Sequence, residues 1–189
     1  LISQQPRPYA GWGQQYTMDL KPAGARSYEP ASLDPQYTAM NIELLLKCYE
    51  MTGDRRYLER IGDAIGWLKK AAIRRTRNKG VFIYPKFVDP TTGKPLYTHR
   101  IGEDVIFGHY YANGDSTHTL AHYGNFRRID LGRLEADDQK ISAEQPGSAT
   151  AGSPLRPRKS DSRSMSKRFE KVMDYLHASG SSRDRVVPS

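Results

Sequence analysis

Apolar residues recur at helical spacing over two adjacent stretches of the chain. In the first, Asp34 and Pro35 form an N-cap and first-turn pair, and the apolar face runs on to a stop at Thr52 and Gly53. In the second, apolar residues follow Asp54 at steps of three and four over residues 57–72. Because the connection is short, we expect an antiparallel αα-hairpin whose apolar faces need further helices to cover them.

The segments around this hairpin carry other patterns. Residues 9–30 mix aromatic, amide, glycine and proline residues without a helical period, which predicts an irregular segment. Residues 80–84 (GVFIY) predict a short strand that leads into a basic loop, and residues 89–93 (DPTTG) predict a turn, so we expect a small β-hairpin there. Residues 105–123 are rich in aromatic residues and histidines but have no assignable period, and we expect them to be mostly irregular.

The composition changes after residue 134. Residues 135–189 are rich in Asp, Gln, Ser, Pro, Lys and Arg and offer little to bury, which predicts a disordered basic tail. One apolar stripe over residues 165–178 predicts a single short helix in this tail, and such a helix alone is marginal in water. The pattern therefore predicts a mainly α-helical domain over residues 1–134, followed by the tail.

The formal net charge of the 189 residues is +8, which admits nucleic acids, anionic surfaces and acidic polysaccharides as partners. The single cysteine, Cys48, excludes an internal disulfide framework. Its place on the apolar face of the first predicted helix favours a buried structural thiol over a nucleophile. No apolar run approaches the roughly 18 residues that a membrane helix needs, so we expect a soluble chain without a membrane partner.

Two groups of residues offer weaker chemical signals. His118 and His122 have the spacing of one helix face, and His109 precedes them, but no HExxH glutamate accompanies them, so we favour surface histidines over a zinc site. Residues 74–79 (RRTRNK) could contact phosphates, but at the end of a predicted helix they are explained by the helix dipole, which favours cations there. Since no nucleic-acid motif, phosphate-binding loop or catalytic triad stands out, we expect no nucleic-acid partner.

The basic loop over residues 86–102 (KFVDPTTGKPLYTHRIG) presents Arg100 together with Lys86 and Lys94. A guanidinium group can hold a carboxylate through two hydrogen bonds, and nearby lysines add point charges. The loop therefore suits an acidic ligand, although a solvated basic loop without a ligand has the same composition.

A second stretch completes a family pattern with this loop. Residues 11–33 have the spacing W-x-x-Q-Y…P…A-R-x-(F/Y)-E-P, and the loop aligns without gaps on R-F-Y-E-x-x-T-N-R-P-x-F-x-G-R-D-G. The two stretches together resemble polysaccharide lyase family 10, the pectic acid lyases, over about residues 12–102. The matching positions of the first stretch are Trp12, Gln15, Tyr16, Pro22, Arg26, Tyr28, Glu29 and Pro30.

The resemblance implies an (α/α) toroid of helical hairpins, incomplete in this chain, in a secreted or periplasmic pectate lyase. Such an enzyme cleaves polygalacturonate by calcium-assisted β-elimination during pectin degradation. Arg100 matches the arginine taken as the base that removes the C5 proton, and because arginine is charged in nearly all settings, desolvation and neighbouring cations would have to favour its neutral form. The residues expected to bind substrate are Arg26 and Lys86, with Glu29 orienting Arg26, together with Lys94 and Tyr16.

The chain departs from the family pattern at several positions. Lys86 replaces an arginine and loses its bidentate geometry, His99 and Ile101 flank Arg100 where the family has Gly and Asp, and the family's downstream E-R-R-x-G-Y segment is not recognisable. The family's calcium ligands precede the matching region, so we assign no metal ligand here and expect the chain to be part of a longer protein. The alternative function is therefore a non-catalytic or inactive homologue that binds acidic polysaccharides.

Overall fold

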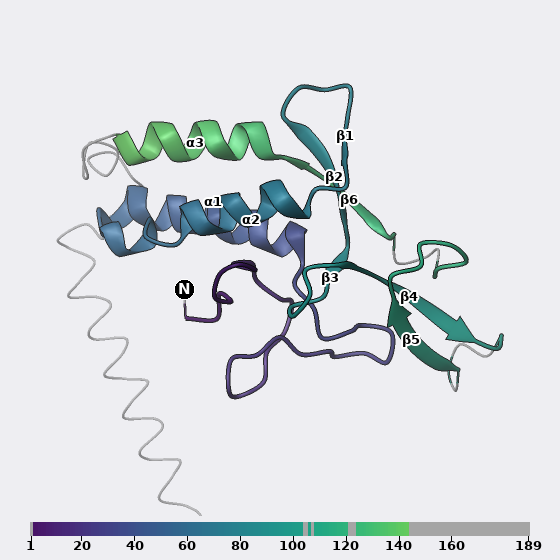
Figure 1. The fold of residues 1–189 in the computed structure, drawn as a ribbon. Helices are drawn as coiled ribbons and strands as arrows, with labels where there is room; N and C mark the ends of the chain where they lie inside the picture. Colours follow the sequence, from purple (N-terminus) through teal and green to yellow (C-terminus); the bar gives the residue numbers. More distant parts are fainter. Residues whose placement is uncertain (1, 104–105, 107, 121–123, 144–189) are drawn as a thin grey trace, which may run out of the picture. The chain divides into compact units, whose positions relative to one another are not determined.

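The structure is a computed structural model that describes residues 2–103, 106, 108–120 and 124–143, all within one compact unit, Leu1–Ser148 (Figure 1). The predicted helix over residues 165–178, and the rest of the predicted tail after residue 143, lie outside the described residues. The elements in chain order are α1 (Pro35–Thr52), the 3-10 helix η1 (Arg55–Tyr57), α2 (Ile61–Ala71), β1 (Arg74–Arg75), β2 (Val81–Pro85), β3 (Phe87–Val88), β4 (Pro95–Ile101), β5 (His109–Asn113), β6 (Phe126–Asp130) and α3 (Leu131–Ala143).

Helix α1 begins and ends where its sequence signals predicted. The Asp34 carboxylate accepts hydrogen bonds from the backbone N–H groups of the first turn, and Gly53 ends the helix in the left-handed conformation with φ 71°. Cys48 on this helix is half-buried rather than buried. Helix α2 starts later than predicted, because Asp54 caps only η1, where its carboxylate binds both the backbone and the guanidinium group of Arg56.

The described strands form two antiparallel sheets of three strands each. The first sheet has the order β1-β2-β6, and the second has the order β3-β4-β5. A small hairpin does form around residues 89–93, but its strands are β3 and β4; the strand predicted over residues 80–84 is β2, which pairs with β1 and β6 instead. A single residue, Lys86, separates β2 from β3, so the chain passes from one sheet to the other at that residue.

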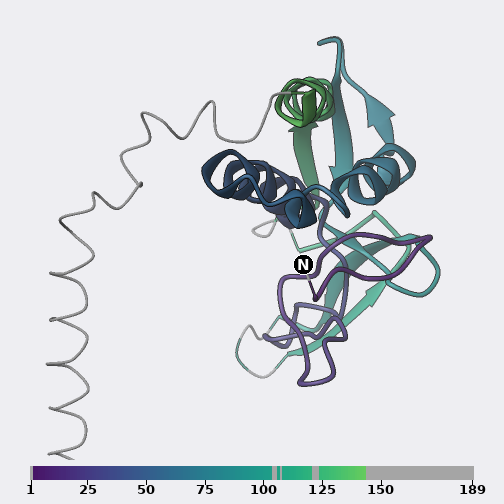
Figure 2. The same cartoon turned by 90° about the vertical axis from the view of Figure 1, so that its left-hand side faces the viewer.

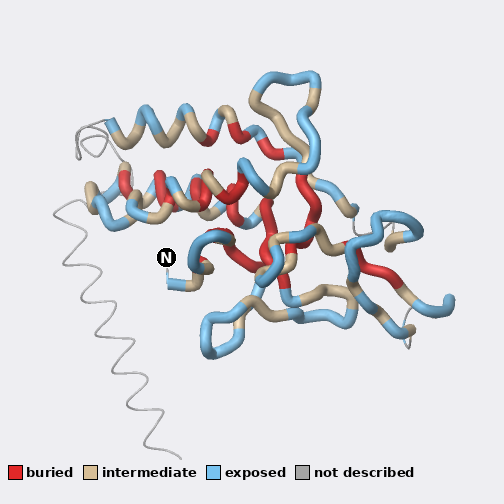
Figure 3. The backbone as a smooth tube through the Cα atoms, viewed as in Figure 1, coloured by how far each residue is buried: buried red, intermediate tan, exposed pale blue. Residues whose placement is uncertain are grey.

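The three helices contact one another, as the nearly end-on view of Figure 2 shows, and α3 also contacts β2. The buried stretches in Figure 3 lie on the helices, on both sheets and on the N-terminal segment that carries Trp12. One cluster joins apolar side chains from these elements, including Trp12, Leu33, Ile42, Leu46, Ile61, Ala64, Leu68, Tyr84, Ile129, Leu131 and Leu134.

The fold is a mixture of helices and antiparallel sheets, so the prediction of a mainly α-helical (α/α) toroid is wrong. Helix α2 ends at Ala71, and the arginines predicted at its end form β1 and the loop after it, so the helix dipole does not explain them. Residues 109–113, predicted as irregular, form β5. These strands have only two and five residues, so periodicity along the chain gives little sign of them.

Helix α3 runs through the boundary that the composition predicted at residue 134. Asp130 caps it, because its carboxylate accepts a hydrogen bond from the backbone N–H of Arg133 at 2.9 Å. Only Leu131 and Leu134 are buried on this helix, and an ion pair joins Arg133 to Glu43 on α1. A helix with so few apolar residues has the composition of a tail, although its contacts with α1 and α2 hold it in the folded unit.

Candidate anion-binding site

Lys86 lies at the junction of the two sheets, and its side chain is buried. The residue is 6% exposed, and its backbone N–H donates a hydrogen bond to the carbonyl oxygen of Asn125 at 2.8 Å. Its ammonium nitrogen lies 4.6 Å from the centre of the Phe87 ring, a cation–π distance. Because lysine is rarely fully buried, the junction is an unusual place in which the fold holds this side chain largely out of water.

Four charged residues act on this ammonium group, and with it they form what we call the Lys86 cluster. The pKa of Lys86 is lowered from 10.5 to about 8, mainly by burial and further by repulsion from Arg127 and Arg26. Attraction to Asp34 and Glu29 raises the pKa and opposes part of the shift. Below about pH 8, the cluster therefore combines the buried charge of Lys86 with those of the half-buried Arg127 and the exposed Arg26.

The two carboxylates of the Lys86 cluster each have partners of their own. Asp34 accepts from the backbone N–H of Gln36 at 2.7 Å and from the side-chain amide of Gln14. Glu29 lies 3.0 Å from the guanidinium group of Arg26 and also accepts from the backbone N–H of that arginine at 3.3 Å. Both carboxylates therefore have other hydrogen-bond donors besides the Lys86 ammonium group.

The irregular N-terminal segment reaches the Lys86 cluster through backbone pairing with β3. Leu33 and Val88 exchange two hydrogen bonds, of 2.8 and 2.9 Å, and the N–H of Asp34 donates to the carbonyl oxygen of Trp12 at 2.8 Å. The N–H of Glu29 donates to the carbonyl oxygen of Arg26 at 2.9 Å and closes a turn. This pairing fixes residues 26–34 beside the junction without a regular element.

Arg127 belongs to the cluster, and the sequence analysis did not identify it. It lies on β6 opposite Tyr84 of β2, and its Nη1 donates to the carbonyl oxygens of Gly124 and Phe126 at 2.9 and 3.1 Å. The alternation of residues 126–130 about Ile129 is the one local sign that this segment is a strand. The pairing of this strand with β2 brings Arg127 to Lys86, and no residue of the segment itself indicates that pairing.

Of the predicted site residues, Arg26, Glu29 and Lys86 interact electrostatically, whereas Arg100 lies on β4 of the second sheet. Arg100 is opposite Tyr110 in the β4–β5 pair, and its Nε donates to the carbonyl oxygen of Gly102 at 3.0 Å. The Tyr110 ring meets the Tyr28 ring edge-on at 5.7 Å, which links this strand face to the turn over residues 26–29. Arg100 is not among the charged groups that shift the pKa of Lys86.

Tyr16 and Lys94 occupy other places among the described residues. The phenol oxygen of Tyr16 accepts from the backbone N–H of Gly13 at 2.5 Å, and burial raises the pKa of this phenol. Lys94 is exposed in the β3–β4 turn, where its carbonyl oxygen accepts from the N–H of Asp89 at 2.9 Å. No described interaction joins either residue to the Lys86 cluster.

The part of the chain that the structure describes contains no group of three His, Cys, Asp or Glu side chains placed to hold a metal ion. Calcium as a cofactor stays a prediction from the family resemblance, whose calcium ligands precede the matching region. His118 lies outside any helix, with φ 50°, so it offers no helix face, while His122 lies outside the described residues.

Comparison with known proteins does not place the chain in a family. No protein-family model matches it, and no curated protein matches it. The resemblance to polysaccharide lyase family 10 therefore stays a prediction from the residues. Among the described residues, no helix is long and apolar enough to cross a membrane.

Proposed function

We propose that this chain binds an acidic polysaccharide, with polygalacturonate as the expected ligand, and that Lys86 and Arg26 hold its carboxylates. The observation that carries the proposal is the buried ammonium group of Lys86 beside two arginines. A carboxylate bound there would relieve the repulsion among the three cations. Electrostatic attraction is stronger at such a shielded site than in bulk water.

Arg26 and Lys86 differ in exposure, and this difference suggests the order in which a carboxylate would meet them. The side chain of Arg26 is 63% exposed, whereas Lys86 is buried, so a carboxylate can meet the arginine first and the lysine after it loses water. The rings of Tyr28 and Tyr110 are half-buried nearby and offer apolar surface to a sugar ring. The resemblance of residues 12–102 to pectic acid lyases favours galacturonate over other acidic sugars.

The test of this proposal is calorimetric binding of trigalacturonate to the wild type and to Lys86→Met. Methionine keeps an unbranched apolar chain and removes the charge, so we expect affinity to fall by about tenfold or more. The matched control is Lys94→Met, which removes an exposed lysine outside the cluster and should bind like the wild type. Equal affinity of the wild type and Lys86→Met, with both variants folded by circular dichroism, would refute the proposal.

A second candidate function is cleavage of the same polymer by β-elimination, and the lowered pKa of Lys86 favours it. In this reaction a base takes the C5 proton, the freed electron pair forms the C4–C5 double bond, the C4–O4 bond breaks, and the departing oxygen takes up a proton. The resemblance assigns the base to Arg100, but a guanidinium group stays charged in nearly all settings. A lysine with a pKa of about 8 is neutral in a substantial fraction of molecules near that pH, which suits a general base.

Formation of the unsaturated product, followed by its ultraviolet absorbance, separates the two assignments of the base. Polygalacturonate with added calcium is the substrate, and the proteins are the wild type, Arg100→Ala and Lys86→Met. If Arg100 is the base, Arg100→Ala loses turnover while Lys86→Met mainly weakens binding. If Lys86 is the base, its variant loses turnover, and wild-type turnover rises with pH through about 8. Binding of trigalacturonate without product from the wild type would leave the non-catalytic function.

A further inference from the structure

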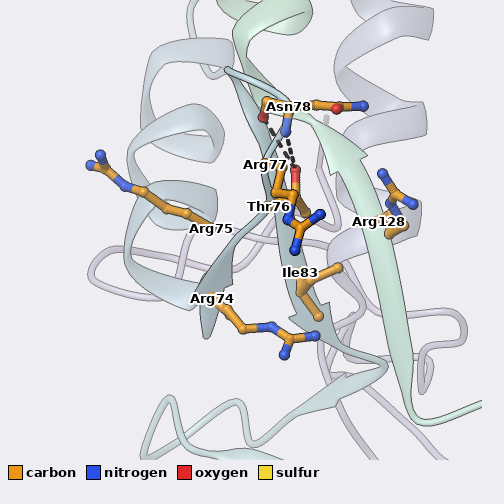
Figure 4. Close-up of a pocket in the computed structure, with 7 residues that line it drawn as sticks. All are labelled: Arg74, Arg75, Thr76, Arg77, Asn78, Ile83 and Arg128. Atoms are coloured by element: carbon orange, nitrogen blue, oxygen red, sulfur yellow. Dashed lines mark hydrogen bonds between the residues drawn. The ribbon is translucent and has the colours of Figure 1, made fainter.

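A second basic surface lies on the first sheet, at a hollow of about 610 Å³ (Figure 4). Arg74, Ile83 and Arg128 are direct cross-strand neighbours, so they form one row over β1, β2 and β6. The next row contains Phe82 and Ile129, which pack against the core. Because side chains alternate between the two faces of a sheet, the first row faces away from the core. We call the surface around this row the arginine groove; its lining residues are Arg74, Arg75, Thr76, Arg77, Asn78, Ile83 and Arg128.

The guanidinium groups of the arginine groove have no carboxylate partner among the described residues. Arg74, Arg77 and Arg128 make no described ion pair, whereas Arg7 and Arg133 each pair with a carboxylate. Figure 4 shows Arg74 and Arg128 on either side of Ile83, with Arg77 close to it, and Arg75 extending from the other side of the strand. Arg75 instead lies over the Phe82 ring, 5.7 Å from its centre. The groove therefore concentrates positive charge that the folded chain does not neutralise.

The arginine groove continues into a second hollow of about 580 Å³ that has an apolar lining. The two hollows share Arg74, Ile83 and Arg128, and the second adds Ile73 and Phe126, which are 43% and 47% exposed. The Phe126 ring contacts the ring of Tyr97 on β4 edge-on at 5.9 Å. Basic and apolar side chains thus alternate along a surface that runs from β1 towards the second sheet.

We infer that the arginine groove binds a further stretch of the acidic polysaccharide, with each guanidinium group paired to a separate uronate carboxylate. Neighbouring strands are about 4.8 Å apart, so the backbones of Arg74 and Arg128, on either side of β2, are about 10 Å apart. This spacing suits successive charges on an extended polymer better than one small anion. The alternating apolar side chains suit the carbon face of the sugar rings. The inference rests on the proposed function for the identity of the polymer.

The lining of the groove favours a polysaccharide over a nucleic acid. Single-stranded nucleic acids are held by aromatic platforms on which the bases stack, in addition to a basic path for the backbone. The seven residues that line the first hollow include no aromatic side chain, and the second hollow adds one, Phe126, so the surface offers a single ring and not a row of stacking platforms. Planar carboxylates pair with guanidinium groups through two parallel hydrogen bonds, and they need no stacking surface.

The test compares binding of long polygalacturonate and of trigalacturonate to the wild type and three variants. The groove variant is Arg74→Ser with Arg128→Ser, and the cluster variant is Lys86→Met. The control, Arg55→Ser with Lys140→Ser, removes the same charge from two exposed residues outside both sites. We expect the groove variant to bind the long polymer about tenfold more weakly and trigalacturonate as the wild type does. The control should match the wild type with both ligands.

The outcomes separate this inference from the proposed function. If the groove variant binds the long polymer as tightly as the wild type, the inference is wrong, whatever Lys86→Met does. If the groove variant loses affinity for the polymer but Lys86→Met binds trigalacturonate normally, the groove stands and the proposed Lys86 site fails. If the wild type binds neither ligand, both are wrong. Tighter binding of duplex DNA than of polygalacturonate at equal salt would overturn the inference in favour of a nucleic-acid surface.

Discussion

At the scale of single residues, Lys86 makes the stability of the fold depend on pH. Its pKa falls from 10.5 to about 8 in the folded protein, so the unfolded chain binds more protons between these two values. The free energy of unfolding rises with pH wherever the unfolded state binds more protons. For Lys86 this rise occurs between about pH 8 and pH 10.5. Below that range, the buried charge costs up to about 3 kcal/mol.

Lys86→Met should therefore stabilise the protein near pH 7, by about 1–3 kcal/mol, because it removes the buried charge. The difference in unfolding free energy between the variant and the wild type should shrink as the pH rises past about 8. Urea unfolding of both proteins across this pH range measures the effect. A variant that is less stable than the wild type at pH 7, or a difference that stays constant with pH, would contradict this account of Lys86.

Gly93, in the β3–β4 turn, is a second single residue on which the stability of the fold depends. Its φ is 70°, and a Cβ atom placed on it would lie 2.3 Å from a ring carbon of Tyr9. Gly93→Ala should destabilise the protein by about 1–3 kcal/mol, through backbone strain and the clash. Gly62→Ala is the control, because a Cβ atom there meets nothing within 4 Å and alanine favours the helix by about 0.5–1 kcal/mol. Opposite shifts of the two melting temperatures are expected, and a loss of stability in both would count against this reading of the turn.

At the scale of elements, Asp34 connects helix α1 to the candidate site. Its carboxylate caps the helix and also attracts the ammonium group of Lys86. Asp34→Ala should lower the unfolding free energy by about 1–2 kcal/mol. Asp34→Asn should keep most of the cap, because asparagine caps nearly as well, while it removes the charge. Equal losses for the two variants in urea unfolding would show that the cap is not the main contribution of this residue.

The same elements show which parts of the fold can be predicted from the sequence. Helix α1 and the β3–β4 hairpin are specified by nearby residues: Asp34 and Gly53 bound the helix, and the Asp89 carboxylate accepts from the N–H groups of Thr91 and Thr92 in the turn. Strand β6 and helix α3 depend on partners distant in the sequence, namely β2 and α1. Their own residues are mostly polar, so burial could not be inferred from them.

The candidate site also contains residues that the sequence identifies and one that it does not. Arg26, Glu29 and Lys86 were identified by their match to a family pattern, and the structure does place them together. Arg127 was missed because it reaches Lys86 only through the pairing of β6 with β2. Arg100 has the central role in the family pattern, yet it lies on β4 of the second sheet and is not among the charged groups that act on Lys86.

At the scale of the whole molecule, the charge of +8 should make polysaccharide binding depend on salt and on free carboxylates. Between about 0.1 M and about 1 M salt, the Debye length shrinks from about 10 Å to about 3 Å, so retention on immobilised polygalacturonate should fall steeply. Methyl esterification neutralises the carboxylates and should also abolish retention at low salt. Affinity electrophoresis in gels with unesterified and esterified polymer measures both effects. Equal retention by the two polymers would mean that charge does not drive the binding.

The single-residue connection at Lys86 has a mechanical consequence. One residue spans at most about 3.6 Å, so the connection between β2 and β3 is too short for either sheet to move independently of the other at this point. A ligand that holds the Lys86 side chain therefore restrains the hinge itself, and bending of one sheet against the other becomes harder while the ligand stays bound. No described interaction joins β4 to the Lys86 ammonium group. Hydrogen exchange of the β4 amides should nevertheless slow when trigalacturonate binds, because the restraint at Lys86 also limits the motion of the second sheet.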